Sequence, residues 1–121
     1  PSTLDLSSGT PVFTRETEGD TSSMTLFSVS KIDDADAEKG ACGLENGKGY
    51  GGVDVWVLTL DAATLPESIT YGTLPDGATE DAPAVDLEDG KLYQAIWGNC
   101  SCWNLWWTQG DSGSGIRADG C

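Results

Sequence analysis

The sequence predicts an all-β domain, built as an antiparallel immunoglobulin-like β-sandwich of about seven strands with disulfide-tethered loops. Three observations support this fold class. Short apolar or alternating segments recur along the chain, and residues typical of turns separate them. Helical periodicity is almost absent, since the one amphipathic candidate, residues 33–39, has no apolar stripe. No linker or internal repeat divides the 121 residues, so residues 1–121 are expected to form a single domain around one hydrophobic core.

Each expected strand is a short run with β-type alternation of side chains. The clearest is 53–60, where three valines alternate with Trp56, Leu58 and Leu60. Apolar residues on both faces predict a central strand that is covered on both sides. The Pro-Asp-Gly sequence at 75–77 is a strong turn signal, because proline presets the first turn position and glycine accepts a positive φ. In chain order, the expected strands are 3–6, 12–18, 23–31, 53–60, 68–73, 91–97 and 102–109.

The remaining segments are expected to be irregular. These are 33–52, 78–89 and the Gly/Ser-rich tail 110–121. The N-terminal arm, residues 1–10, has Leu4 and Leu6 in strand alternation. It is therefore expected either to form the first strand of its own sheet or to add a strand to a neighbouring subunit.

Four cysteines and no histidine indicate disulfides rather than a zinc site. Cys100 and Cys102 are separated by one residue, so their side chains point to the same side of a strand and do not readily bond each other. Of the pairings that remain, we favour Cys42 with Cys100 and Cys102 with Cys121, which pins the tail. Two disulfides indicate an oxidising compartment, and we therefore expect a secreted or cell-surface protein whose leader has been removed.

The chain is strongly acidic. It has 20 Asp and Glu residues against 6 Lys and Arg residues, for a formal net charge of −14. Such a surface repels phosphate backbones and anionic lipid headgroups, so neither nucleic acid nor a membrane surface is an expected partner. No apolar stretch is long enough to span a bilayer.

Residues 65–98 carry a pattern of turn residues in a fixed order. A strand ending in Y-G is followed by P-x-G, a P-A step, L-x-x-G and a tyrosine-bearing strand. This segment resembles small secreted bacterial β-sandwich proteins and lipoproteins of unassigned role. The resemblance implies a bacterial β-sandwich, and it assigns no catalytic residue.

The tryptophans near the C-terminal end are the main candidate binding residues. In the strand 102–109, alternation places Trp103 and Trp107 on the face expected to line the core and Trp106 on the opposite face. Trp106, and less clearly Trp97, is therefore expected at the surface, where it either stacks on a sugar ring or enters an interface. The candidate ligand or interface residues are Trp97, Trp103, Asn104, Trp106 and Gln109.

Two further motifs have the appearance of catalytic or metal sites. Residues 110–115, Gly-Asp-Ser-Gly-Ser-Gly, resemble the nucleophile motif of trypsin-like serine proteases. That chemistry needs a general base, normally histidine, and the chain has none, so Ser112 is interpreted as part of a Gly/Ser loop.

The second motif has the ligand spacing of a calcium-binding loop, and its acidic members are Asp34, Asp36, Glu38 and Glu45. Lys39 stands where such a loop needs glycine, and Cys42 lies inside it. A solvated acidic loop is therefore the favoured interpretation, and no metal or cofactor is expected.

Together these observations favour a non-enzymatic extracellular structural or adhesive subunit. It would associate with copies of itself or with another extracellular protein through aromatic surface and strand edges. The alternative is a carbohydrate-binding module that uses exposed tryptophans as platforms for a glycan. No catalytic residue is predicted, because the commonest general base and metal ligand is absent.

Overall fold

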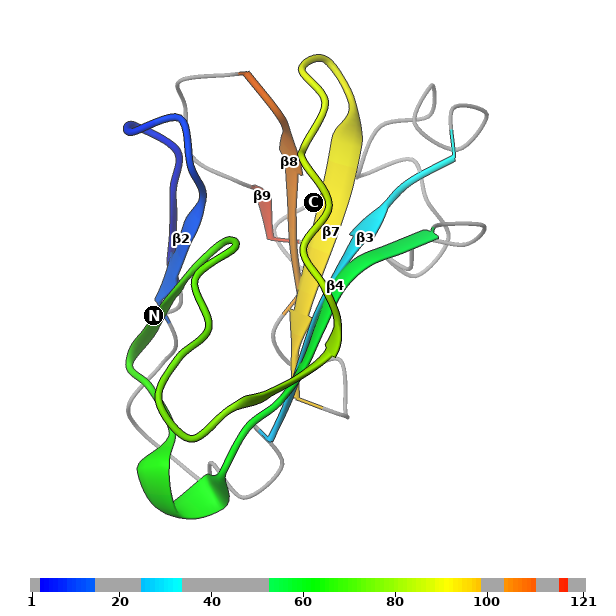
Figure 1. The fold of residues 1–121 in the computed structure, drawn as a ribbon. Coiled ribbons are helices and arrows are strands. Elements are labelled where there is room, and N and C mark those ends of the chain that lie inside the picture. The colour runs from blue at the N-terminus through cyan, green and yellow to red at the C-terminus, as the bar shows by residue number, and fades with distance from the viewer. Residues whose placement is uncertain (1–2, 15–24, 34–52, 99–103, 111–115, 118–121) are drawn as a thin grey trace.

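The computed structural model shows a β protein with two antiparallel sheets (Figure 1). It describes residues 3–14, 25–33, 53–98, 104–110 and 116–117. The all-β prediction is confirmed for these residues. Their elements are β1 (Thr3–Asp5), β2 (Val12–Thr14), β3 (Leu26–Lys31), β4 (Val53–Thr59), the 3-10 helix η3 (Ala62–Thr64), β5 (Ser68–Thr70), β6 (Thr79–Ala82), β7 (Leu92–Trp97), β8 (Asn104–Thr108) and β9 (Ile116–Arg117).

The strands form a small sheet and a large one. The small sheet has the order β1-β2-β5, and the large sheet has the order β6-β4-β3-β7-β8-β9. Leu4 of β1 pairs with Phe13 of β2, so the described part of the N-terminal arm is the first strand of its own sheet. Of the two expectations for the arm, pairing within the chain is the one that the structure shows.

Aromatic side chains fill the space between the two sheets. Phe13 of the small sheet is fully buried, and its ring lies 5.1 Å from the ring of Phe27 and 5.5 Å from that of Trp107, both in the large sheet. These strands alternate inward apolar and outward polar residues, so one face of each sheet supplies the core. Burial of such large apolar rings stabilises the packing of the two sheets.

The structure corrects the sequence prediction in three places. Segment 78–89 was expected to be irregular, but Thr79–Ala82 is a strand, and Ile116–Arg117 in the tail is another. Pairing with β4 gives Thr79–Ala82 a strand conformation although its sequence is short and acidic, because sheet context outweighs intrinsic propensity. The expectation that 53–60 is covered on both faces is wrong at Val53, which is 64% exposed.

Candidate functional site

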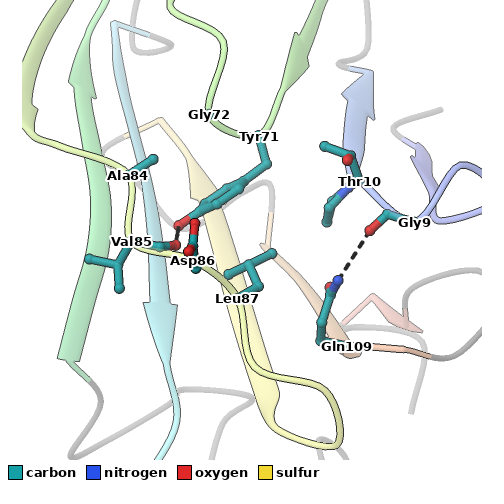
Figure 2. A pocket seen from close by; sticks show the side chains of 10 residues that line it. Gly9, Thr10, Tyr71, Gly72, Ala84, Val85, Asp86, Leu87 and Gln109 are labelled. Carbon is teal, nitrogen blue, oxygen red and sulfur yellow. Dashed lines mark hydrogen bonds between the residues drawn. The ribbon is translucent and has the colours of Figure 1, made fainter.

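A hollow of about 630 Å³ opens between the small sheet and the chain that follows β6. We call residues 83–89 the strap and this space the strap hollow. Figure 2 shows Tyr71 and the strap on one side of the hollow, with Gly9, Thr10 and Gln109 on the other. Its volume lies within the range of about 300–1,000 Å³ that is usual for ligand sites. It is lined by Gly9, Thr10, Pro11, Tyr71, Gly72, Ala84, Val85, Asp86, Leu87 and Gln109.

Tyr71 fixes the first half of the strap. The backbone N–H of Val85 donates to the carbonyl oxygen of Val55 in β4 at 3.0 Å. The Tyr71 hydroxyl donates to the carbonyl oxygen of Val85 at 2.5 Å. The Tyr71 ring packs edge-on against Trp56, with ring centroids 5.2 Å apart, so the large aromatic core holds the hydroxyl in place. These contacts hold the first half of the strap in a fixed position beside β4 and Tyr71.

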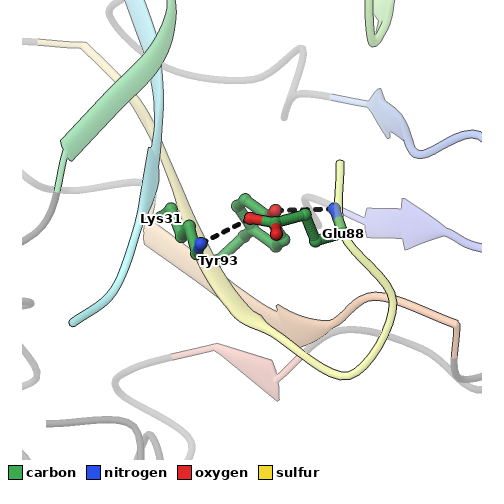
Figure 3. Close-up of polar contacts among 3 residues, drawn as sticks. All are labelled: Lys31, Glu88 and Tyr93. Atoms are coloured by element: carbon green, nitrogen blue, oxygen red, sulfur yellow. Dashed lines mark hydrogen bonds and ion pairs between the residues drawn. The ribbon is translucent and has the colours of Figure 1, made fainter. Parts of the chain in front are cut away.

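Tyr93 and an ion pair fix the second half of the strap (Figure 3). The backbone N–H of Glu88 donates to the hydroxyl of the buried Tyr93 at 2.8 Å. The Glu88 carboxylate also pairs with the ammonium of Lys31 in β3. The pair is largely exposed and so contributes at most about 1 kcal/mol, which leaves the buried hydroxyl as the firmer anchor.

Gln109 closes one end of the strap hollow. Its Oε1 accepts a hydrogen bond from Trp107 Nε1 at 3.1 Å, and its Nε2 donates to the carbonyl oxygen of Gly9 at 3.1 Å. The side chain thereby joins the end of β8 to the turn between β1 and β2. Among the candidate ligand residues whose side chains the structure describes, Gln109 lines the hollow and Trp97 and Trp106 do not; both ends of the Gln109 amide bind the protein itself.

Of the residues that the structure describes, two with titratable side chains line the strap hollow, Tyr71 and Asp86. Burial raises the pKa of Tyr71 to about 12; the hydrogen bond to Val85 opposes this shift, and Tyr93 and Asp86 add to it. Tyr71 is therefore a protonated hydrogen-bond donor at neutral pH. Asp86 is exposed and brings negative charge to the hollow.

Carboxylates on β6 serve the fold. Glu80 accepts a hydrogen bond from the indole N–H of the buried Trp56 at 2.8 Å. Asp81 accepts one from the Thr59 hydroxyl at 2.6 Å. Both contacts join β6 to β4. These two carboxylates therefore stabilise an edge strand, and the strap begins directly after that strand.

The tryptophans near the C-terminal end that the structure describes are all buried. Trp97 is fully buried, with its ring 5.4 Å from that of Phe27. Trp107 is 3% exposed and lies in the same core, as the alternation predicts. The expected exposure of Trp97 is therefore wrong, because its strand pairs Trp97 with Phe27, the residue at the centre of the core.

Trp106 lies on the opposite face from Trp107, as predicted, but it is also fully buried. It forms a second apolar cluster with Ile32, and Leu92 packs against both. Its Nε1 has no hydrogen-bond partner within the described ranges. The expected exposure of Trp106 is wrong because a period of two assigns a side chain to a face of the sheet but does not say whether that face is covered.

Several predicted residues lie outside the described residues. These include Trp103, the acidic loop residues Asp34, Asp36, Glu38 and Glu45, Ser112, and the cysteines Cys42, Cys100, Cys102 and Cys121. Asn104 begins β8, and its side chain is also outside the description. Across the ranges that are described, no group of three or more His, Cys, Asp or Glu side chains could hold a metal ion. The same ranges contain no helix that is long and apolar enough to cross a membrane.

Sequence reasoning missed the residues that build the strap hollow. Tyr71 lies inside the expected strand 68–73, and Ala84–Leu87 lies in a segment expected to be irregular. A local signal was available in the alternation of apolar and acidic residues at Val85, Asp86, Leu87 and Glu88, shortly after a proline. Such alternation indicates an extended segment, although it does not say which part of the chain packs beside it.

No protein-family model, curated protein or solved structure matches the chain. The resemblance of residues 65–98 to small secreted bacterial proteins thus stays a prediction. Function is therefore inferred from the residues of the site itself.

Proposed function

We propose that this chain is an extracellular immunoglobulin-like β-sandwich module with a structural or adhesive role, which binds a partner in the strap hollow and catalyses no reaction. The composition of the hollow carries the proposal. Its lining offers the apolar surface of the half-buried Ala84 and Leu87, whereas the polar ends of Tyr71 and Gln109 bind backbone carbonyls of the protein. Such a surface suits recognition better than reaction.

The titratable groups support a non-enzymatic role. General acid–base catalysis works best with a group whose pKa lies near the working pH. Tyr71, with a pKa of about 12, stays protonated, and Asp86 is the one carboxylate in the lining. The chain has no histidine to complete a catalytic pair.

Adhesion to a different partner has more support than self-association. The edge strand β6 carries Glu80 and Asp81, and Pro83 follows directly. Charged residues and proline at a sheet edge oppose pairing with a second chain. A net charge of −14 also repels another copy.

The carbohydrate-binding alternative has less support. Trp97 and Trp106 are both fully buried, so neither presents a ring face to a glycan. The strap hollow offers an aromatic residue, Tyr71, but that ring already packs against Trp56. A glycan would also have to displace or share the amide of Gln109.

Retention of the protein on immobilised gelatin and on cellulose tests the proposal. We expect retention on gelatin that falls in Leu87→Ser, which removes apolar surface from the hollow. The matched control is Leu74→Ser, at an exposed leucine outside the hollow. Thermal unfolding shows whether both variants are folded.

Two results would contradict the proposal. One is equal retention of the two variants on gelatin. The other is hydrolysis of a chromogenic ester or glycoside that disappears in Asp86→Asn, since this would make the hollow an active site. Retention on cellulose alone would favour the carbohydrate-binding alternative.

A further inference from the structure

We propose that the strap hollow binds an extended peptide segment of a partner protein, with a Lys or Arg side chain placed against Asp86, and that the peptide adds to the strap as a β-strand. This inference rests on the proposed function, because it names the chemical class of the partner for the same site. Three properties of the hollow support it: free backbone groups, half-buried apolar side chains in the lining, and charge.

The strap has backbone groups available for strand addition. Val85 uses its N–H and its C=O on the side of β4 and Tyr71. In an extended chain the backbone groups of successive residues point to alternate sides, so those of Ala84 and Asp86 point away from β4. Within the described part of the chain, neither of these two residues forms a backbone hydrogen bond. A peptide laid along this side would supply the missing partners.

Tyr71, Gly72 and the strap form one wall of the hollow, and this wall includes apolar side chains. Ala84 and Leu87 are half-buried, and Tyr71 is partly exposed beside them. A Cβ placed on Gly72 would meet no atom within 4 Å, which leaves open space at this wall. Alternate side chains of an added strand can therefore contact the wall, while the intervening ones face solvent.

Charge selects a cationic peptide. Among the described residues of the lining, Asp86 is the charged one, and none is Lys or Arg. The chain as a whole carries −14, which attracts a cationic segment and repels an acidic one. The same negative charge disfavours a second copy of this chain as the partner.

Fluorescence anisotropy with a labelled peptide tests the inference. The probe is acetyl-Thr-Val-Lys-Val-Thr-amide, and its comparisons replace lysine by glutamate or methylate the backbone nitrogens of the two valines. We expect the glutamate peptide to bind at least about fivefold more weakly, as loss of an exposed ion pair together with repulsion implies. The methylated peptide should bind more weakly still, because it cannot add as a strand.

The matched protein variants are Asp86→Asn and Asp76→Asn, which remove the same charge inside and outside the hollow. We expect Asp86→Asn to weaken binding about two- to fivefold and Asp76→Asn to have little effect. Amide resonances of Ala84 and Asp86 should shift on addition of the probe. Equal affinity for the three peptides, or equal effects of the two variants, would overturn the inference.

The outcomes separate the two proposals. If Leu87→Ser lowers retention on gelatin but the lysine peptide does not bind, the adhesive role stands and the cationic peptide is the wrong partner class. If Leu87→Ser has no effect and no peptide binds, both proposals are wrong. Binding of the peptide with shifts confined to residues outside the strap would place its site elsewhere.

Discussion

The side-chain amide of Gln109 donates a hydrogen bond to the carbonyl oxygen of Gly9, and this contact joins residues one hundred positions apart in the chain. It links the end of β8 to the turn between β1 and β2. Trp107 donates to the same amide, so the aromatic core sets the position of this link. One end of the strap hollow therefore depends on a single side chain.

Replacing Gln109 by alanine should lower the free energy of unfolding by about 1–2 kcal/mol, because two hydrogen bonds of this side chain are lost. Urea denaturation measures the change. Gln109→Glu keeps the acceptor for Trp107 but loses the donor to Gly9, so its effect should be intermediate. The control is Thr73→Ala at an exposed turn residue, and an equal effect of the two alanine variants would argue against the link.

The pH dependence of stability should report on Tyr71. Burial raises its pKa in the folded protein to about 12 from the ordinary value of 10.0. The protonated hydroxyl is therefore favoured by folding: its contribution to stability is complete below pH 10 and is lost as the pH rises from 10 towards 12. Absorbance titration of tyrosinate should show a late-ionising tyrosine that disappears in Tyr71→Phe. A titration curve unchanged by that substitution would contradict the assignment.

Replacing Phe13 by alanine should destabilise the protein by about 3–5 kcal/mol, because Phe13 fills the space between the two sheets. Phe13→Leu should cost less, since it leaves a smaller cavity. Chemical denaturation monitored by tryptophan fluorescence is a suitable measurement. Val53→Ala, at an exposed valine, is the comparison, and similar losses in the Phe13 and Val53 variants would show that the sheets do not pack through Phe13.

Replacing Glu80 by alanine should cost about 1–3 kcal/mol, because it leaves the N–H of a fully buried indole, that of Trp56, without its acceptor. Glu80→Gln retains an acceptor and should cost less. Hydrogen exchange at the amides of β6 should accelerate in the alanine variant. Asp76→Ala removes an exposed carboxylate from a turn and serves as the control; matching exchange rates in the two variants would rule out this role for Glu80.

The local sequence pattern was sufficient to predict the all-β class and the central residues of most described strands. The period of two in β8 placed Trp107 and Trp106 on opposite faces, and both assignments agree with the structure. The same pattern led to the wrong exposure for Trp106. Burial depends on what covers a face, and this involves residues distant in the sequence, here Ile32 of the segment after β3.

The sequence by itself determined an acidic all-β chain without histidine, and it thereby directed the functional argument towards binding. Only the tertiary structure decided where the proposed binding surface lies. The strap hollow brings together Gly9, Tyr71, the strap and Gln109, which come from four separate parts of the chain. Alternation and turn residues are local properties of a chain, whereas a hollow between sheets is set by contacts across it.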